Sequence, residues 1–193
     1  MNFLAHLYLS GNNPNLIVGN FMADAVKGNS YLKFEDEIQQ GILLHREIDT
    51  FTDQHPIVKQ SKRRLNKRYN HFGGIIIDIF YDHFLAKNWT QFSNIPLELY
   101  VSEVYKILQK SAKIYPSNVN RLLYFMVYEN WLLSYQHTDE IKKVLTRMSY
   151  RTKHQSYMEL AIEDLLLHYG DFEKDFMLFF KEMILFAQSK IKT

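Results

Sequence analysis

Apolar residues recur along most of the chain at the three- and four-residue spacing of amphipathic helices. The segment Ile75 to Ile77 alone would also suit a strand, but its apolar character continues to Trp89, beyond the length of an ordinary strand. The pattern predicts five helices in the first half of the chain, over Asn2 to Ser10, Asn15 to Lys27, Phe34 to Asp53, Ile57 to Tyr69 and Ile75 to Trp89. It predicts further helices that begin at Pro96 and Pro116, and a final helix near the C-terminus. We therefore expect an all-α protein of about eight to ten helices around one core.

Composition supports this interpretation. The chain has 193 residues, of which 47% are hydrophobic and 23% charged, as in an ordinary globular protein. Its 7 Gly and 4 Pro are too few for the frequent turns of a β-sandwich or barrel. We expect residues 1–193 to form a single helical domain.

The chain contains no cysteine, so disulfides, thiolate catalysis and cysteine metal sites are excluded. No apolar run approaches the length of a membrane span, and the N-terminal segment MNFLAHLYLS lacks the basic start of an export signal. We expect a cytoplasmic protein, in which any metal is bound by His, Asp or Glu.

Two predicted helices carry ionisable residues at helical spacing. In GILLHREIDTFTD, His45, Asp49 and Asp53 lie four apart and so face one way. In GIIIDIFYDHFLA, Asp78 and Asp82 are also four apart, on a helix so apolar that their burial needs compensation by protons, hydrogen bonds or cations.

Two earlier helices add His6, among apolar neighbours, and Asp24, just before a helix end. Imidazole nitrogens and carboxylate oxygens are ligands for Mn²⁺, Mg²⁺, Fe²⁺ or Zn²⁺. The candidate metal ligands are His6, Asp24, His45, Asp49, Asp78 and Asp82. Each residue alone also has a structural interpretation, as a core histidine, a helix cap or part of a solvated face, but together they favour a metal or polar catalytic site.

The segment IVKQSKRRLNKRYN is strongly basic, with six Lys or Arg residues and no acid between Gln54 and Ile77. These residues are Lys59, Lys62, Arg63, Arg64, Lys67 and Arg68. The segment suits a solvated face or an acidic protein partner. A nucleic-acid partner is not favoured, because few aromatic residues lie nearby and no known nucleic-acid module is present.

The chain resembles the acyl carrier protein phosphodiesterase family in MNFLAHLYLS, GNFMADAVKG, GILLHREIDTFTDQHP, IIIDIFYDHFLAKNW and ENWLLSYQHTDEIKKVLTRMSYR. That family is similar to the helical HD phosphohydrolases, although the adjacent pair here is Asp82-His83, in reversed order. The resemblance implies an HD-like fold and metal-dependent removal of 4′-phosphopantetheine from holo-acyl carrier protein, with Mn²⁺ as the favoured ion. It also implies that the basic segment docks the acidic carrier protein.

Within that mechanism, we expect the six candidate ligands to hold one or two ions, with four or five of them touching metal. His83 is the candidate proton donor to the leaving serine oxygen, and Arg46 the candidate phosphate contact. Two alternatives remain open: a phosphodiesterase or nucleotidase for small substrates, and a non-catalytic helical protein that binds an acidic partner.

Overall fold

Helices make up most of the computed structural model, which describes residues 1–191 and contains no strand within that range. The α-helices are α1 Phe3–Leu9, α2 Pro14–Met22, α3 Asp36–Gln54, α4 Pro56–Arg64, α5 Gly73–Lys87, α6 Leu97–Lys110, α7 Ser117–Tyr128, α8 Trp131–Ser134, α9 Thr138–Arg151, α10 Ala161–Leu167 and α11 Tyr169–Ile191. Short 3-10 helices connect them at η1 Ala23–Ala25, η2 Gly28–Lys33, η3 Lys67–Phe72, η4 Trp89–Gln91, η5 Ala112–Ile114 and η6 Met158–Leu160. The predicted all-α class is confirmed, with eleven α-helices in the described residues rather than eight to ten.

Two predicted helices end earlier than expected. The second stops at Met22 and continues as η1, after starting at an Asn13 side chain that accepts hydrogen bonds from the amides of Asn15 and Leu16. The basic helix stops at Arg64, because Leu65 turns to an extended conformation and its side chain is buried. Breaks of this kind depend on tertiary contacts, which a periodic pattern does not contain.

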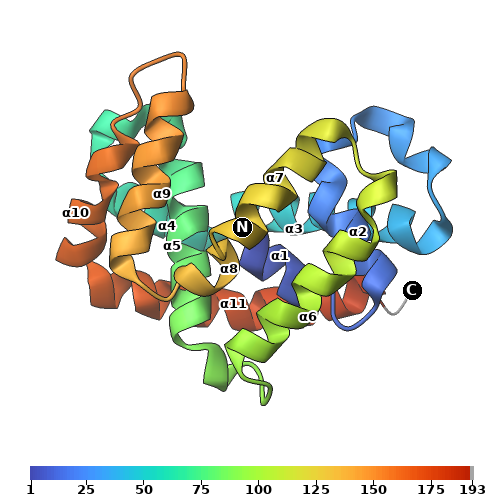
Figure 1. The fold of residues 1–193 in the computed structure, drawn as a ribbon. Helices are drawn as coiled ribbons and strands as arrows, with labels where there is room; N and C mark the ends of the chain where they lie inside the picture. The colour runs from blue at the N-terminus through green and yellow to red at the C-terminus, as the bar shows by residue number, and fades with distance from the viewer. Residues whose placement is uncertain (192–193) are drawn as a thin grey trace.

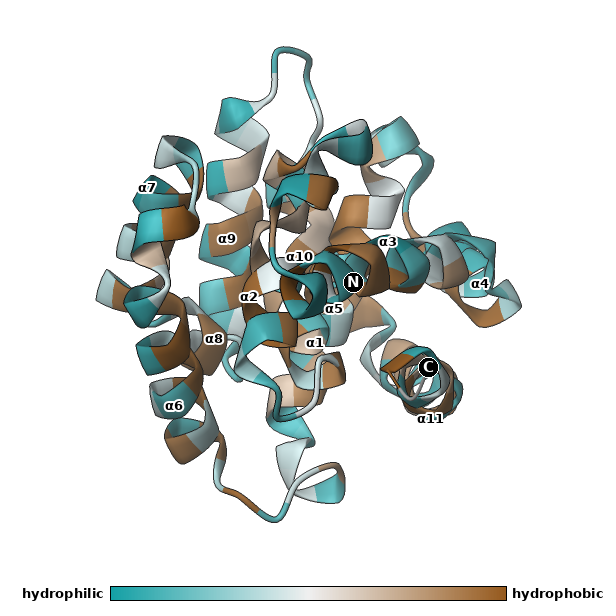
Figure 2. Cartoon of the chain, turned by 90° about the vertical axis from the view of Figure 1, so that its right-hand side faces the viewer, coloured by the Kyte–Doolittle hydropathy of each residue, from teal (hydrophilic) through white to brown (hydrophobic). Residues whose placement is uncertain are grey.

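The buried apolar residues form one continuous core. Helix α1 lies near the middle of the molecule, α5 and α9 lie to one side, α2 and α3 to the other, and α11 runs along the base (Figure 1). Helix α11 packs against α1, α3, α4 and α5. Figure 2 shows hydrophobic residues on the central helices, whereas α4 is mainly hydrophilic.

Among residues 1–191, none of the helices combines the length and the apolar composition that a membrane crossing requires.

Candidate metal centre

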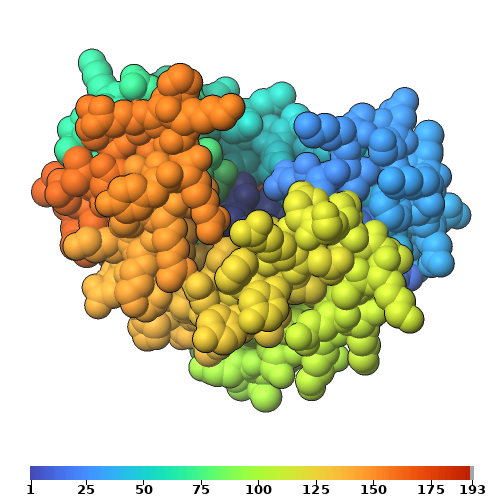
Figure 3. Space-filling view, turned by 45° about the horizontal axis from the view of Figure 1, so that its top comes forward, coloured from blue at the N-terminus to red at the C-terminus, as the bar shows by residue number. Residues whose placement is uncertain are grey.

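A pocket of about 280 Å³, called the main pocket below, opens between α1, α2, α3 and α5. Its polar lining comes from Asn2, His6, Asn20, Asp24, His45, Asp49, Thr52, Asp53 and Asp78, and its apolar lining includes Phe3, Leu7 and Phe21. Figure 3 shows the molecule hollowed at this place, with the dark blue N-terminal residues deep inside. Four of the helices thus contribute to one open site.

The close crossing of α2 and α3 builds one wall of this pocket. Gly19 and Gly41 meet at the crossing, where a Cβ on Gly19 would stand 2.1 Å from the Ile38 carbonyl oxygen. A Cβ on Gly41 would stand 2.3 Å from the Leu16 carbonyl oxygen. Both contacts are with backbone, so only glycine permits this separation. The crossing brings residues 20–24 beside the face of α3 that carries His45 and Asp49.

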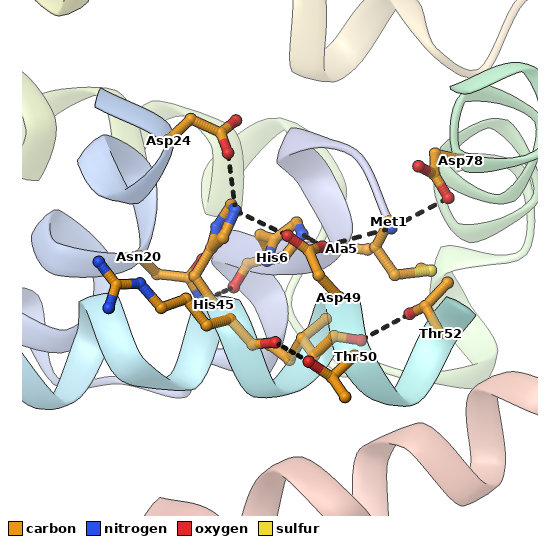
Figure 4. Close-up of polar contacts among 12 residues, drawn as sticks. Met1, Ala5, His6, Asn20, Asp24, His45, Asp49, Thr50, Thr52 and Asp78 are labelled. Carbon is orange, nitrogen blue, oxygen red and sulfur yellow. Dashed lines mark hydrogen bonds and ion pairs between the residues drawn. The ribbon is translucent and has the colours of Figure 1, made fainter. Parts of the chain in front are cut away.

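Asn20 fixes the orientation of the His45 ring. The Asn20 amide nitrogen donates to the His6 carbonyl oxygen and to Ser10 Oγ, at 3.0 and 2.9 Å, so the amide oxygen points to His45. His45 Nδ1 lies 2.9 Å from that oxygen and must donate a proton to it, because an amide oxygen only accepts. His45 Nε2 therefore faces the pocket, where it lies 3.2 Å from Asp24 Oδ1 and 3.1 Å from Asp49 Oδ2 (Figure 4).

His6 completes what we call the histidine–aspartate cluster, which consists of His6, His45 and Asp49. The two imidazole rings stack with their centroids 4.0 Å apart, and His6 Nε2 lies 3.1 Å from Asp49 Oδ1. Ligand atoms from these three residues all lie within 4.8 Å of one another. Both histidines are buried, whereas Asp49 is half-buried and reaches into the pocket.

The charges of the cluster are strongly coupled. Burial opposes a charge on His45, but hydrogen bonds and attraction from Asp24 and Asp49 raise its pKa to about 9. Burial, together with the charge of His45, lowers the pKa of His6 to about 4. Burial would raise the pKa of Asp49, yet the two histidines hold it far below its usual range. The hydrogen bond with His45 likewise lowers the pKa of Asp24.

This donor set fits a divalent cation. In a neutral His45 the Nδ1 proton is committed to Asn20, so an unprotonated Nε2 faces two carboxylates, an arrangement that requires a proton or a metal ion between them. The ionised Asp49 carboxylate only accepts, so without a metal ion the His6 proton lies on Nε2, while the buried His6 Nδ1 has no hydrogen-bond partner in the described part of the chain and can take up that proton when a cation binds Nε2. Mixed imidazole and carboxylate ligands suit Mn²⁺, Fe²⁺ or Zn²⁺.

Asp78 lines the same pocket from α5. Its Oδ1 lies 3.0 Å from the amino group of Met1, which is also 3.9 Å from Asp49 Oδ1. Asp78 is therefore linked to the histidine–aspartate cluster through a cation of the chain itself (Figure 4).

The fully buried carboxylate of Asp82 has a different set of partners. Its two oxygens accept from the backbone amides of Leu4 and Ala5, at 2.7 and 3.2 Å, and it is absent from the pocket lining. Burial raises its pKa to about 7, although these amide bonds oppose the shift. Asp82 thus holds the first turn of α1, the helix that carries His6.

His83 and Arg46 are not brought to the main pocket. His83 is buried, with Nδ1 2.7 Å from the Tyr135 carbonyl oxygen and Nε2 2.7 Å from Tyr169 Oη. Arg46 donates to the carbonyl oxygens of Val26 and Gly28, at 2.8 and 2.9 Å. Arg46 thereby holds the loop that follows Asp24, and His83 ties α5 to its neighbours.

Three of the six basic residues form ion pairs within the protein, and the other three are exposed to solvent. Lys62 pairs with Asp53 at 2.9 Å, Arg64 with Asp175, and Arg68 with Glu163 at 3.7 Å. The other three, Lys59, Arg63 and Lys67, are exposed and enter none of the ion pairs found among residues 1–191. Because Asp53 lines the main pocket, Lys62 places α4 at its edge.

Sequence reasoning missed Asn20. The sequence did contain a signal, because Asn20 is a polar side chain within the apolar run LIVGNFM and is buried in α2, four residues before Asp24. Its partner on α3 was not visible in the sequence.

Comparison with known proteins gives consistent matches over nearly the whole chain. The sequence model of the family described as "Acyl carrier protein phosphodiesterase" matches residues 1–183. The chain is also similar to two proteins named acyl carrier protein phosphodiesterase. The protein from Pectobacterium atrosepticum is 32% identical over 98% of this chain and 99% of its own length. The protein from Klebsiella pneumoniae strain 342 is 34% identical over 98% of this chain and 99% of its own length. The relative of that name in Photorhabdus laumondii is 32% identical over 98% of this chain and 96% of its own. No solved structure matches, so likeness to the HD fold stays a prediction.

Proposed function

Because the chain belongs to the acyl carrier protein phosphodiesterase family, we propose that it hydrolyses the phosphodiester between 4′-phosphopantetheine and a serine of holo-acyl carrier protein. The products are apo-acyl carrier protein and 4′-phosphopantetheine. The observation that carries the proposal is the convergence of His6, His45 and Asp49 in an open pocket of a chain that matches this family over residues 1–183.

The reaction joins a water oxygen to phosphorus and breaks the bond between phosphorus and the serine oxygen, which takes up a proton. A divalent cation, with Mn²⁺ as the proposed ion, supplies positive charge for the phosphate oxygens and makes water more acidic. His6, His45 and Asp49 would hold it, with Asp24 as a further ligand at the exposed edge.

The protein's own residues supply orientation. Asn20 keeps His45 Nε2 directed into the pocket, and Asp82 keeps α1, with His6, in place. Phe3 and Phe21 line one wall with apolar surface, which reduces the access of bulk water to the phosphate.

The proposal is tested by mass spectrometry of holo-acyl carrier protein incubated with chelator-treated protein, with and without Mn²⁺. We expect Mn²⁺-dependent loss of the phosphopantetheine mass. An unchanged mass under every metal tried, with the protein folded, would contradict it, and activity on nucleotides alone would favour a small-molecule phosphodiesterase.

We further propose that α4 and η3 dock the acidic carrier protein. Lys59, Arg63 and Lys67 are exposed on α4 and η3, and α4 reaches the edge of the main pocket through the ion pair of Lys62 with Asp53, so their positive charge would attract an acidic partner to this side of the protein. Lys62, Arg64 and Arg68 belong to the same surface but also stabilise the fold through their ion pairs.

Reversal of the three exposed charges, K59E, R63E and K67E, should raise KM for holo-acyl carrier protein by about tenfold or more at low salt, with little change in kcat. The matched control reverses three exposed lysines elsewhere, K110E, K113E and K142E. Equal KM values for the two triple variants would show that α4 and η3 are not the docking surface.

A further inference from the structure

We infer that the pantetheine arm of the substrate lies in a groove between α7, α8 and α9 that continues from the main pocket. This inference rests on the proposed function, because it assigns the place of the organic group next to the phosphate. The groove, called the arm groove below, consists of two adjoining hollows lined mainly by α7, α8 and α9.

The arm groove adjoins the main pocket. Its first hollow, of about 210 Å³, shares Asn2 and Phe3 with the main pocket. Its second hollow, of about 440 Å³, shares Leu122, Trp131, Arg147 and Arg151 with the first. A substrate whose phosphate lies at the histidine–aspartate cluster therefore has a path past Phe3 and Trp131. Figure 3 shows the central hollow bordered by the yellow and orange segments, which include α7 and α9.

Two helix faces line the arm groove at helical spacing. Helix α9 contributes Val144, Arg147, Met148 and Arg151, and α7 contributes Asn118, Arg121, Leu122 and Phe125. Each set follows the i, i+3, i+4, i+7 pattern of a face that normally packs against another element. In the described part of the chain, the main packing partners of α7 are α6 and α8, and those of α9 are α5, α10 and η6. The two faces are thus left open toward each other.

The chemistry of the groove changes along its length as the chemistry of the arm does. Next to the main pocket the lining is largely apolar, with Phe3, Leu122, Val144 and Met148. In 4′-phosphopantetheine the second carbon from the phosphate ester oxygen bears two methyl groups, which suit such a lining.

Farther along, the guanidinium groups of Arg121, Arg147 and Arg151 border the second hollow. Arg147 pairs with Glu129, which also accepts from the indole nitrogen of Trp131 at 3.0 Å. The other two arginines enter none of the ion pairs among residues 1–191. Their N–H groups are donors for the two amide carbonyls of the arm, which carries no charge beyond its phosphate.

The test uses the full-length protein with Mn²⁺ and the variant M148W, which fills the first hollow, compared with K142W on the exposed side of the same helix. Binding of pantetheine, which lacks the phosphate, is followed by ligand-observed NMR. Steady-state kinetics with holo-acyl carrier protein and Mn²⁺ affinity by electron paramagnetic resonance are measured on the same preparations. R151A removes an exposed donor without touching the core and provides a second variant whose folding is not at issue.

M148W should weaken pantetheine binding and raise KM by about tenfold or more, with Mn²⁺ affinity unchanged, since one misfitting group in a pocket has effects of this size. R151A should weaken pantetheine binding by about threefold, and K142W should behave as wild type. Wild-type pantetheine binding and KM in both M148W and R151A would overturn the inference. So would unaltered pantetheine binding combined with a raised KM for holo-acyl carrier protein, which would assign the groove to the protein partner.

Failure of the proposed function gives a different result. A wild-type protein that leaves holo-acyl carrier protein intact would contradict the hydrolysis, whereas the pantetheine titration still decides whether the groove binds the arm.

Discussion

Helices α3 and α5 both carry ionisable residues four apart, but their side chains have different surroundings. On α3, His45 and Asp49 point into the main pocket, and His45 Nε2 meets only carboxylates there. On α5, only Asp78 reaches the pocket, while Asp82 and the adjacent His83 are enclosed by backbone amides, a carbonyl and a tyrosine hydroxyl. Spacing shows which residues share a helix face, and the partners of each polar atom decide whether it can bind a ligand.

The largest effect is expected at Asp49. D49A removes the carboxylate between the two histidines, so we expect activity on holo-acyl carrier protein to fall by about a thousandfold or more. Helicity by circular dichroism should be retained, because Asp49 is half-buried at the pocket.

D53N is the matched control for D49A, since Asp53 lies one turn further along α3 and is exposed. It should keep most of the activity. A fall in D53N as large as that in D49A would mean that the cluster is not the centre of the chemistry.

Asp82 should matter through stability. In D82A the amides of Leu4 and Ala5 lose their acceptor inside the core, which should reduce the free energy of unfolding by about 3 kcal/mol. Urea denaturation measures this value. A D82A protein as stable as wild type, yet without activity, would place Asp82 in the chemistry instead.

Protons should compete with the cation at His45. Its pKa of about 9 means that the metal-free protein carries a proton there at pH 7, and a bound ion must displace it. Mn²⁺ affinity should therefore fall about tenfold for each pH unit below 9, and about one proton should be released for each ion bound. His6, with a pKa of about 4, is already neutral above pH 5 and does not contribute to this pH dependence. The same proton stabilises the metal-free fold fully below pH 6.5, and this contribution is lost as the pH rises through 9.

Calorimetry in buffers of different ionisation enthalpy measures the proton release. A Mn²⁺ affinity independent of pH between 6 and 8 would contradict this account of His45.

The smallest effect is expected at His83. H83Q should cost about 1 kcal/mol of stability, because two hydrogen bonds that tie α5 to Tyr135 and Tyr169 are altered. The value of kcat should stay within about twofold of wild type, because the ring is buried and does not line the main pocket. A strong loss of kcat together with a changed pH profile would restore His83 as the proton donor.

Much of the fold follows from the sequence, because long amphipathic stretches such as α3 and α11 specify their own helices. The ends of α2 and α4 do not follow from the sequence pattern. The end of α2 depends on Arg46, which holds the chain after Asp24, and the end of α4 depends on the burial of Leu65.

The candidate site is only partly visible in the sequence. Residue type and spacing indicated His6, Asp24, His45, Asp49 and Asp78, all of which line one pocket. They did not show that Gly19 and Gly41 allow α2 and α3 to meet, or that Asn20 orients His45, because both facts join residues more than 20 positions apart. The enclosure of Asp82 and His83 is likewise a property of packing.

Mn²⁺ binding to three proteins, the wild type, D49N and H83Q, tests the contrast between the two helices most directly. Measured by electron paramagnetic resonance, H83Q should bind the ion as wild type does, and D49N should bind it about a hundredfold more weakly. Wild-type affinity in D49N, or its loss in H83Q, would contradict the assignment of the metal centre to the histidine–aspartate cluster.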